Sequence, residues 1–334
     1  MTKILIIRFS SIGDIVLTTP VIRCVKKQWE GDVEVHYLTK KGFSSLLDKN
    51  PYLSKVYSIK EHVNEVVDQL KMEHYDYIID LHRNIRSLQV KKALKALSFS
   101  FDKLNLQKWL LVNFKINRLP DKHIVDRYLE TVLAFGIKND GKGLDYFVPE
   151  KEKFDLSQLP DSFQKKYIAF AIGGTYATKK LPEHKIIELC KGLHLPIILL
   201  GGKEDIEVGK NIESSLTSKN IYNACGTLNL HQSASVVEQS ACVISHDTGM
   251  MHIAAALKKP IVSIWGNTVP ELGMYPYQTG FGLRGEGTII ENRSLSCRPC
   301  SKLGYNTCPK KHFKCMEDIE NKRVVDVVKS LVEI

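Results

Sequence analysis

The sequence predicts an α/β fold of two consecutive domains, each with a parallel sheet covered by helices. Three observations point to this class. The length of 334 residues suits two domains of ordinary size. Short apolar runs alternate with amphipathic segments, which is the pattern of βαβ units. A stretch rich in Gly, Pro, Lys and Asp, residues 139–165, interrupts this alternation, which then resumes, so this stretch predicts a linker.

Four short apolar runs in the first half are typical of the buried strands of a parallel sheet. They are Ile4–Ile7, Val33–Leu38, Val56–Ile59 and Tyr77–Leu81. Segments with helical periodicity lie between and after these runs, and they predict helices. They are Val21–Trp29, His62–Leu70 and Ile124–Phe135.

The alternation after the linker predicts a second sheet with its helices. Its strands are expected at Tyr167–Ile172, Ile197–Leu200, Ala241–Ser245 and Ile261–Trp265. Its helices are expected at Glu183–Leu193, Ser233–Gln239 and His252–Leu257. The predicted domains therefore cover residues 1–155 and 160–315, and a C-terminal helix within 316–334 could pack back on the first domain. Ligands bind beyond the carboxyl ends of parallel strands, so two facing sheets predict an interdomain cleft.

Composition and charge narrow the class of protein and of partner. Hydrophobic residues make up 43% of the chain and charged residues 25%, which excludes a disordered chain, a coiled coil and a collagen-like repeat. No stretch approaches the roughly 20 apolar residues of a membrane-spanning helix. The N-terminus has no secretory signature, so a cytoplasmic location is expected. The net charge of +10 predicts an anionic partner, which could be nucleic acid, a phospholipid surface or a phosphorylated small molecule.

The loop after the first strand contains the first candidate catalytic residue. From Arg8 to Asp14 it reads Arg-Phe-Ser-Ser-Ile-Gly-Asp, a tight turn at the place where an α/β sheet binds ligands. The Asp14 carboxylate could act there as a general base. The alternative role for the same carboxylate is to cap the start of a helix.

Two loops of the second domain carry groups suited to phosphate and sugar. The first runs from Gly173 to Pro182 and combines glycines, threonines and two lysines ahead of a helix, which suits a diphosphate cradle. Taken alone, this loop favours the alternative of a solvated lysine pair. The second runs from His246 to His252 and reads His-Asp-Thr-Gly-Met-Met-His. These are pocket-lining residue types, although an Asx-capped turn is an alternative. The two histidines do not share a helical face, which argues against a shared metal ion.

Four of the eight cysteines cluster near the C-terminus, with the spacing C-x2-C-x7-C-x6-C. In a reducing cytosol such a cluster is more typical of metal binding than of disulfides. The first half matches a zinc knuckle, whereas the second half is looser than usual. The pattern leaves three states open, namely structural zinc, reduced thiols and disulfides. The residues concerned are Cys297, Cys300, Cys308 and Cys315.

Taken together, the three loops resemble glycosyltransferase family 9, whose best-known members are the ADP-heptose:lipopolysaccharide heptosyltransferases of Gram-negative bacteria. The motifs that carry the resemblance are Arg8–Asp14 with Thr19-Pro20, Lys179–Pro182 and His246–Ala256. Further similarity lies in Ile79–Ser87, Asp126–Tyr128 and Pro260–Thr268. The resemblance spans most of the chain, and the order and spacing of these motifs make it specific.

The resemblance implies a GT-B fold of two facing Rossmann-like domains, with the acceptor on the N-terminal domain and the nucleotide sugar on the C-terminal one. It implies inversion at the anomeric carbon with no required metal or cofactor. The general base is then Asp14. The residues implied on the acceptor side are Ser10, Ser11, Arg83 and Arg86. The residues implied at the donor phosphates are Thr175, Lys179, Lys180, Thr248 and Gly249.

For the donor sugar and nucleotide, the resemblance implies Asp247 and His252. The resemblance also implies a ribose-binding acidic residue at Asp205, with Glu204 as the competing alignment, and a contact of Leu228 with the adenine. The sequence departs from the family at Leu181, where a tryptophan is usual, and at Met250-Met251, where a pair such as Pro-Ser is common. These departures leave the phosphate site intact and the identity of the donor sugar open.

The basic charge is concentrated in one stretch. From Arg83 to Pro120 the chain has nine basic residues and a single acidic one, Asp102, together with the apolar group Trp109–Leu111 and Phe114. A solvated basic helix would explain this pattern. The sharper hypothesis is a surface for a phosphorylated, lipid-linked acceptor, in peripheral contact with the cytoplasmic membrane face. Nucleic acid is not an expected partner, because no stripe of aromatic residues interleaved with Lys and Arg is present.

The sequence thus predicts an inverting, metal-independent glycosyltransferase of the bacterial cell envelope. We expect it to move a heptose or related sugar from a nucleotide sugar, with ADP-heptose as the first candidate, to a lipopolysaccharide core acceptor. The alternative is another nucleotide-sugar enzyme on the same fold, with a different donor or with epimerase activity.

Overall fold

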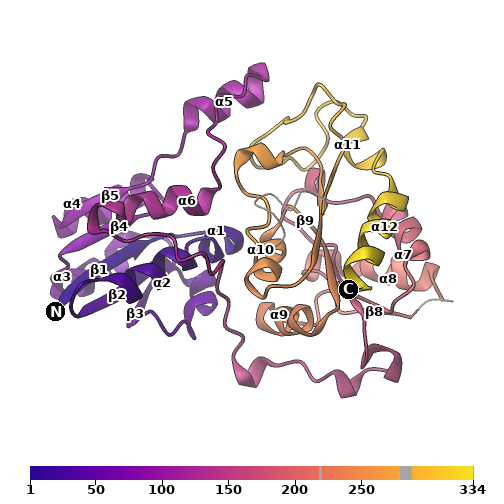
Figure 1. Ribbon diagram of the computed structural model, residues 1–334, viewed down its shortest axis with the longest axis horizontal. Coiled ribbons are helices and arrows are strands. Elements are labelled where there is room, and N and C mark those ends of the chain that lie inside the picture. Colours follow the sequence, from indigo (N-terminus) through magenta and orange to yellow (C-terminus); the bar gives the residue numbers. More distant parts are fainter. Residues whose placement is uncertain (218–219, 279–287, 334) are drawn as a thin grey trace. The chain divides into compact units, whose positions relative to one another are not determined.

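A computed structural model describes residues 1–217, 220–278 and 288–333, and the chain divides into two compact units (Figure 1). The first unit comprises Met1–Leu104 and Lys122–Phe147, and the second comprises Asn105–Asp121 and Val148–Ile334. This division differs from the expected boundaries in two ways. Residues 105–121 belong to the second unit, and the main part of that unit already begins at residue 148.

The first unit is built on a five-stranded parallel sheet of order β3-β2-β1-β4-β5. The four predicted strands are confirmed as β1 (Thr2–Ile7), β2 (Val33–Lys40), β3 (Lys55–Ile59) and β4 (Tyr77–Asp80). The fifth strand, β5 (Leu97–Ser100), was not predicted. Its sequence alternates with serine and three of its four residues are exposed, so it lacks the apolar run of a buried strand.

Helices cover both faces of this sheet (Figure 1). They are α1 (Ile12–Val16), α2 (Thr19–Gln28), α3 (Val67–Met72), α4 (Ile85–Leu94) and α6 (Ile124–Leu129). Leu5 and Ile7 of β1 pack in a cluster with residues of α3 and α4, and the alternation of side chains along a strand sends Ile4 and Ile6 to the other face. Because all four are fully buried, β1 is the centre of the unit.

Two predicted helices are shorter than expected. The segment predicted at 62–70 begins with a 3-10 turn, Val63–Glu65, because the Glu65 carboxylate accepts the N–H groups of residues 60, 61 and 62, and α3 starts only at Val67. The segment predicted at 124–135 is α-helical to Leu129 and continues as a 3-10 helix, Glu130–Phe135. The hydrophobic pattern therefore located both elements but not their internal geometry.

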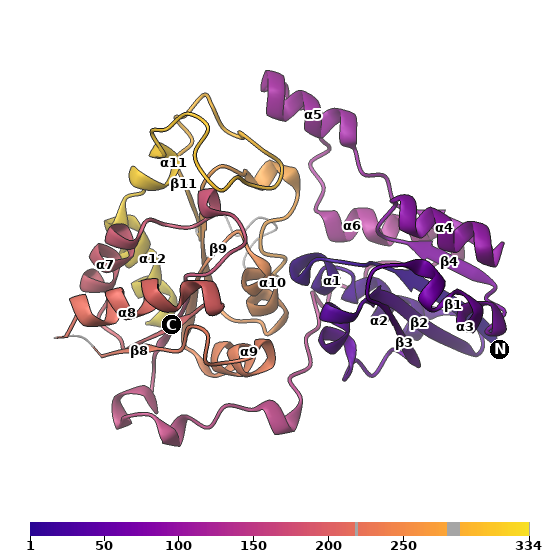
Figure 2. The same ribbon diagram turned by 180° about the vertical axis from the view of Figure 1, so that it is seen from behind.

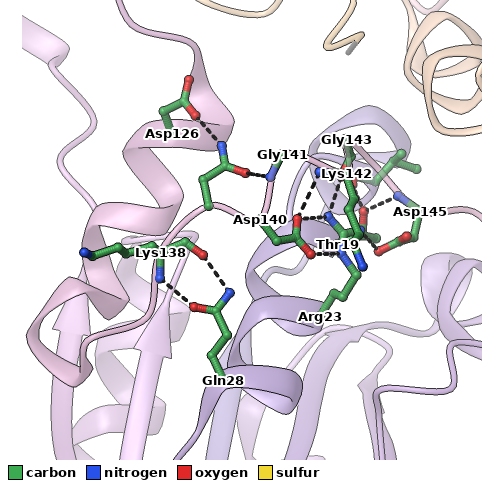
Figure 3. Close-up of polar contacts among 12 residues, drawn as sticks. Thr19, Arg23, Gln28, Asp126, Lys138, Asp140, Gly141, Lys142, Gly143 and Asp145 are labelled. Atoms are coloured by element: carbon green, nitrogen blue, oxygen red, sulfur yellow. Dashed lines mark hydrogen bonds and ion pairs between the residues drawn. The ribbon is translucent and has the colours of Figure 1, made fainter. Parts of the chain in front are cut away.

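A buried arginine holds the end of the first unit in place (Figure 3). Arg23 of α2 has a side chain only 2% exposed and makes ion pairs with Asp140 and Asp145. It also donates to the Gly143 carbonyl at 2.8 Å, and Thr19 accepts the Asp145 N–H at 2.9 Å. Removing one partner of a buried ion pair typically lowers the free energy of unfolding by about 3–5 kcal/mol. Residues 139–147 are thus an ordered part of the first unit, and the linker expectation is wrong for them.

The second unit has a six-stranded parallel sheet of order β11-β10-β9-β6-β7-β8. The four predicted strands are confirmed as β6 (Ile168–Ala171), β7 (Ile197–Leu200), β9 (Cys242–His246) and β10 (Ile261–Trp265). The two edge strands, β8 (Ile221–Asn223) and β11 (Ile289–Glu291), were not predicted. Each has only three residues, which is too short for a periodic signal.

The helices of the second unit include the three that were predicted in it, now bounded as α7 (Glu183–Gly192), α9 (Leu230–Gln239) and α10 (Gly249–Ala256). The others are α5 (Asn105–Phe114), α8 (Ile206–Ser215), α11 (Lys314–Glu317) and α12 (Asn321–Val332). Within the described ranges, no helix is long and apolar enough to cross a membrane.

The C-terminal helix packs within the second unit. Figure 2 shows α12 beside α7. Val324, Val325 and Val328 of α12 are buried in the same cluster as residues of α7, and a Cβ on Gly192 would lie 2.9 Å from Val325. The valine face of this helix therefore completes the core of the second sheet.

Candidate active site

Polar loops in each unit lie where the strand order reverses. In the first unit β1 pairs with both β2 and β4, so the carboxyl ends of β1 and β4 are adjacent. In the second unit β6 pairs with both β7 and β9. Open α/β sheets bind ligands at this switch point. The predicted site residues that follow these strands therefore occupy the favoured positions of their own sheets.

In the first unit, Asp14 uses its two oxygens differently. Its Oδ2 accepts hydrogen bonds from the Ser11 hydroxyl at 2.7 Å and the Ser11 N–H at 3.2 Å, which caps α1. Its Oδ1 lies 2.6 Å from Nη2 of Arg8. The capping alternative is thus correct for one oxygen. The side chain remains 21% exposed, and Oδ1, which pairs only with Arg8, keeps a second lone pair, so Asp14 can still accept a proton from a bound hydroxyl through this oxygen.

The electrostatics around Asp14 keep it ionised. Burial alone would raise the pKa of Asp14, but the Arg8 guanidinium and the Ser11 hydrogen bonds outweigh burial and lower the pKa below its usual value. Arg8 is itself held by the Leu81 carbonyl at 2.6 Å and the Tyr128 hydroxyl at 3.0 Å. Nearby, burial and then the Arg8 charge lower the pKa of His82 to about 4, so its imidazole is neutral at pH 7.

The other predicted acceptor residues follow the same two strands. Ser10 accepts a hydrogen bond from Arg8 Nε through its carbonyl at 2.8 Å. Arg83, just after β4, is exposed and pairs with Asp102 at 2.9 Å. Arg86, in the first turn of α4, donates to the Glu61 carbonyl at 3.2 Å. Ser10 and Ser11 therefore lie beside Asp14, whereas the two arginines follow the neighbouring strand.

In the second unit, Lys179 and Asp247 form an ion pair across the switch point. Lys179 lies in a 3-10 turn after β6, and Asp247 directly follows β9. Lys179 Nζ is 2.6 Å from Asp247 Oδ2 and 3.1 Å from the Asp247 carbonyl. The Thr268 hydroxyl donates to Asp247 Oδ2 at 2.8 Å. The ammonium group is thereby fixed at the carboxyl end of the sheet.

A second ion pair lies next to the first along the sheet. Lys180 Nζ is 3.0 Å from Oδ1 of Asp205, which follows β7 and is 2% exposed. Asp205 Oδ2 accepts the Gly202 N–H at 2.9 Å, whereas Glu204 is exposed. The sequence left Asp205 and Glu204 as competing alignments, and the structure brings Asp205 to the lysine loop.

The N-terminus of α10 lies beside the glycine loop after β6. Thr248 is the N-cap of α10 and Gly249 its first residue. A Cβ added to Gly174 would lie 3.0 Å from the Thr248 methyl group, so only a glycine allows this approach without a shift. The first N–H groups of a helix have no intrahelical partner and carry partial positive charge. Together with the ammonium groups of Lys179 and Lys180, they supply several hydrogen-bond donors at the carboxyl ends of these strands.

The remaining predicted donor residues differ in position. Thr175 is exposed in the loop after β6, and Leu228 is half-buried after the edge strand β8. His252 is buried on α10. His246 is also buried, and its Nε2 accepts the Leu181 N–H at 3.0 Å. Burial and then the Lys180 charge lower the pKa of His246 to about 3, so it is a neutral acceptor that holds the lysine loop.

The cysteine cluster contains free thiols in the structure. Cys297 Sγ lies 3.9 Å from His312 Nε2, and the Cys300 thiol donates to the Cys297 carbonyl at 3.1 Å. Burial raises the pKa of Cys300 to about 11 and that of Cys315 to about 12. Across residues 1–217, 220–278 and 288–333, no group of three or more Cys, His, Asp or Glu side chains is arranged to hold a metal ion.

Four residues at these sites were not identified as functional from the sequence. They are Arg8, His82 and Tyr128 around Asp14, and Thr268 beside Asp247. Each lies in one of the motifs that carry the family resemblance, and that was the available signal. Their roles depend on contacts between segments far apart in the chain, such as the contact between Arg8 and Tyr128, which are 120 positions apart.

Comparisons with known proteins agree with this architecture. The model of the family described as glycosyltransferase family 9 (heptosyltransferase) matches residues 63–303. Lipopolysaccharide heptosyltransferase 1 of Campylobacter coli is 28% identical over 80% of this chain and 84% of its own length. A family 9 glycosyltransferase structure from Veillonella parvula superposes with a TM-score of 0.79 at 20% identity, covering 99% of this chain and 97% of that one. The structure of Escherichia coli ADP-heptose lps heptosyltransferase II superposes with a TM-score of 0.74 at 21% identity, and the match covers 99% of each chain.

Proposed function

Since this chain belongs to glycosyltransferase family 9, the heptosyltransferase family, we propose that it transfers a heptose from ADP-heptose to the core of lipopolysaccharide. The names of its relatives support this acceptor, and the name of a solved neighbour supports this donor. Within the proposal, the reaction inverts the anomeric carbon and needs no divalent cation. The alternative is a related enzyme of the same fold that uses a different nucleotide sugar or epimerises it.

The observation that carries the proposal is the Lys179–Asp247 ion pair beside the N-terminus of α10. A departing nucleoside diphosphate gains negative charge as the bond to the sugar breaks. The fixed ammonium group and the N–H groups around Gly249 would stabilise that charge without reorganising. Lys180 adds a second positive charge, and within the proposal Asp205 accepts a hydrogen bond from a ribose hydroxyl.

On the acceptor side, the proposed general base is Asp14. Its carboxylate takes the proton from the attacking hydroxyl while that oxygen bonds to the anomeric carbon, and the C–O bond to the diphosphate breaks on the opposite face. The Arg8 ion pair makes Asp14 a weak base in the free protein. A weak base suffices if the transition state resembles an oxocarbenium ion, because a hydroxyl attacking such a centre becomes strongly acidic.

A donor panel tests this function. With a heptose-deficient lipopolysaccharide as acceptor, we expect ADP-heptose to support turnover and UDP-glucose and GDP-mannose to support little. The rate is expected to be unchanged by excess EDTA, because Lys179 and α10 take the place of a cation at the diphosphate. Turnover with a uridine or guanosine donor in preference to ADP-heptose, or loss of activity in EDTA that Mg²⁺ restores, would contradict the proposal.

We further propose that α5 contacts the cytoplasmic membrane face near the lipid-linked acceptor. Only Leu111 of α5 is buried, in a small cluster with Val269 and Leu272 of the same unit. Trp109 is 52% exposed and Phe114 is 58% exposed, and the centroids of their rings lie 5.2 Å apart. No acidic residue occurs between Lys103 and Pro120. α5 itself carries one basic residue, Lys108, and three more, Lys103, Lys115 and Arg118, lie just outside its ends. Exposed aromatic residues among basic ones suit an anionic lipid surface.

Lys91 of α4 is less suitable for this role. Lys91 Nζ lies 3.1 Å from Asp80, which is fully buried, and 2.9 Å from the Ser100 hydroxyl. Reversing the charge of Lys91 would place a carboxylate next to a buried one and destabilise the fold. A test of membrane contact therefore belongs on α5.

For that test, we expect the combined change Trp109→Ser, Phe114→Ser and Arg118→Glu to lower binding to vesicles with 30% phosphatidylglycerol by at least about tenfold. Each basic residue near an anionic surface contributes about 1 kcal/mol, and buried aromatic area adds to it. Co-sedimentation measures the effect, and Met72→Ser, an exposed apolar residue on α3, is the matched control. Equal binding by the triple variant and the wild type would contradict the α5 proposal.

A further inference from the structure

The segment that carries the cysteines also carries a buried arginine that joins several loops. The side chain of Arg298 is 4% exposed. Its Nε donates to the Gly266 carbonyl, and its Nη2 donates to the Thr268 carbonyl at 2.8 Å. Its Nη1 donates to the Asn292 carbonyl at 2.6 Å, and an ion pair at 2.9 Å joins Nη2 to Glu291, whose side chain is equally buried. All three nitrogens of the guanidinium are therefore used.

The carbonyls that Arg298 binds include those of the loop Gly266–Thr268, which directly follows β10. Cys300, two residues on in the same segment, donates its N–H to the Asn267 carbonyl at 3.1 Å. At its far end the loop presents the Thr268 hydroxyl to Asp247 at 2.8 Å. Thus one residue, Thr268, accepts from Arg298 through its carbonyl and donates to Asp247 through its side chain.

The same loop contacts the turn that bears Lys179. A Cβ on Gly266 would lie 2.5 Å from the Thr178 carbonyl oxygen, so the two backbones approach as closely as a glycine permits. Thr178 is fixed from its other side by Tyr305, whose N–H donates to the Thr178 hydroxyl at 2.8 Å and whose carbonyl accepts the Thr178 N–H at 3.1 Å. The segment from residue 298 to 305 therefore holds both partners of the Lys179–Asp247 pair.

We propose that Arg298 is a positioning residue for nucleoside diphosphate binding, acting through Thr268 on Asp247 and Lys179. This inference rests on the proposed function of the Lys179 loop. The contribution of Arg298 depends on its planar guanidinium, which donates to several carbonyls at once in a fixed geometry. A lysine would keep the charge beside Glu291 but could not maintain the same set of bonds.

The test measures the dissociation constant for ADP by titration calorimetry, at a temperature where each variant is folded. We expect Arg298→Lys to weaken ADP binding by about tenfold, comparable to the loss of one hydrogen bond to a charged group. Thr268→Val, which removes only the hydroxyl contact to Asp247, is expected to weaken it similarly. The double variant should bind about as weakly as either single one, because both changes act through the same contact. Arg293→Lys is the control, since Arg293 also pairs with Glu291 but is 77% exposed.

Two results would overturn the inference. One is a folded Arg298→Lys protein with the wild-type dissociation constant, even if its Tm is lower, which would mean a purely structural role. The other is a double variant in which the losses of ADP-binding free energy measured for the two single variants add in full. If Arg298→Lys does not fold, Thr268→Val decides alone, and unchanged ADP binding contradicts the inference. A wild type that binds ADP but transfers no heptose contradicts the proposed function only.

Discussion

Replacing Asp14 with asparagine is expected to lower kcat by about 10²–10⁴-fold, the range for loss of a general base. Asparagine keeps the shape and can still accept from Ser11, but it cannot take a proton and it loses the charge opposite Arg8. Donor affinity should change little, because Asp14 belongs to the first unit and the proposed diphosphate site to the second. The measurement is kcat and donor KM from coupled detection of ADP.

The matched control is Asp68→Asn, which removes a carboxylate that is 87% exposed on α3 of the same unit. The wild-type pH profile gives a second check. Since the pKa of Asp14 is lowered in the folded protein, its base form should persist as the pH falls, and kcat/KM should not decline through loss of this base until below about pH 4. An Asp14→Asn variant with the wild-type kcat would show that this carboxylate is not the base.

Replacing Lys179 with alanine is expected to weaken ADP-heptose binding and to lower kcat. Loss of a hydrogen bond from a charged group costs about 1.5–3 kcal/mol in binding. Loss of a preorganised donor to a developing anion lowers kcat by about 10²–10³-fold. The variant also leaves Asp247 without its cation, so the repulsion between that carboxylate and the diphosphate adds to both effects. Calorimetric titration with ADP and steady-state kinetics measure the two contributions separately.

The control for this prediction is Lys210→Ala on α8 of the same unit. This lysine is 61% exposed, and its Nζ lies 3.0 Å from the carboxylate of Glu207, three residues earlier on the same helix. We expect its ADP affinity and kcat to match those of the wild type. If Lys179→Ala also bound ADP and turned over like the wild type, the phosphate-binding role of Lys179 would be wrong. In that case Lys180, at 3.0 Å from Asp205, would be the next cation to test.

The sequence predicted the two sheets because their central strands are apolar along their whole length. Ile4–Ile7 and Ile168–Ala171 are fully or almost fully buried, and such runs have few other structural explanations. The short edge strands β5, β8 and β11 were not predicted, since three or four partly polar residues carry no periodic signal. The order of the strands also requires tertiary contacts that a local pattern does not contain.

The positions of the candidate site residues in loops after strands were predictable from the sequence. The contacts between their side chains were not. Asp14, Lys179 and Asp247 each follow a predicted strand, so their place at the carboxyl ends of the strands could be inferred. The ion pair between Lys179 and Asp247 joins residues 68 positions apart. Arg298 looked like part of a cysteine motif, and only the structure shows that its side chain binds the loop after β10.

The most direct test of the central claim is the fate of both substrates in one reaction. The wild-type protein is incubated with ADP-heptose and heptose-deficient lipopolysaccharide, and ADP release and the mass of the acceptor are followed together. We expect one added heptose on the acceptor for each ADP released, and little ADP release without acceptor. ADP release that does not depend on the acceptor, or conversion of the donor to an epimer with the acceptor mass unchanged, would contradict heptosyl transfer.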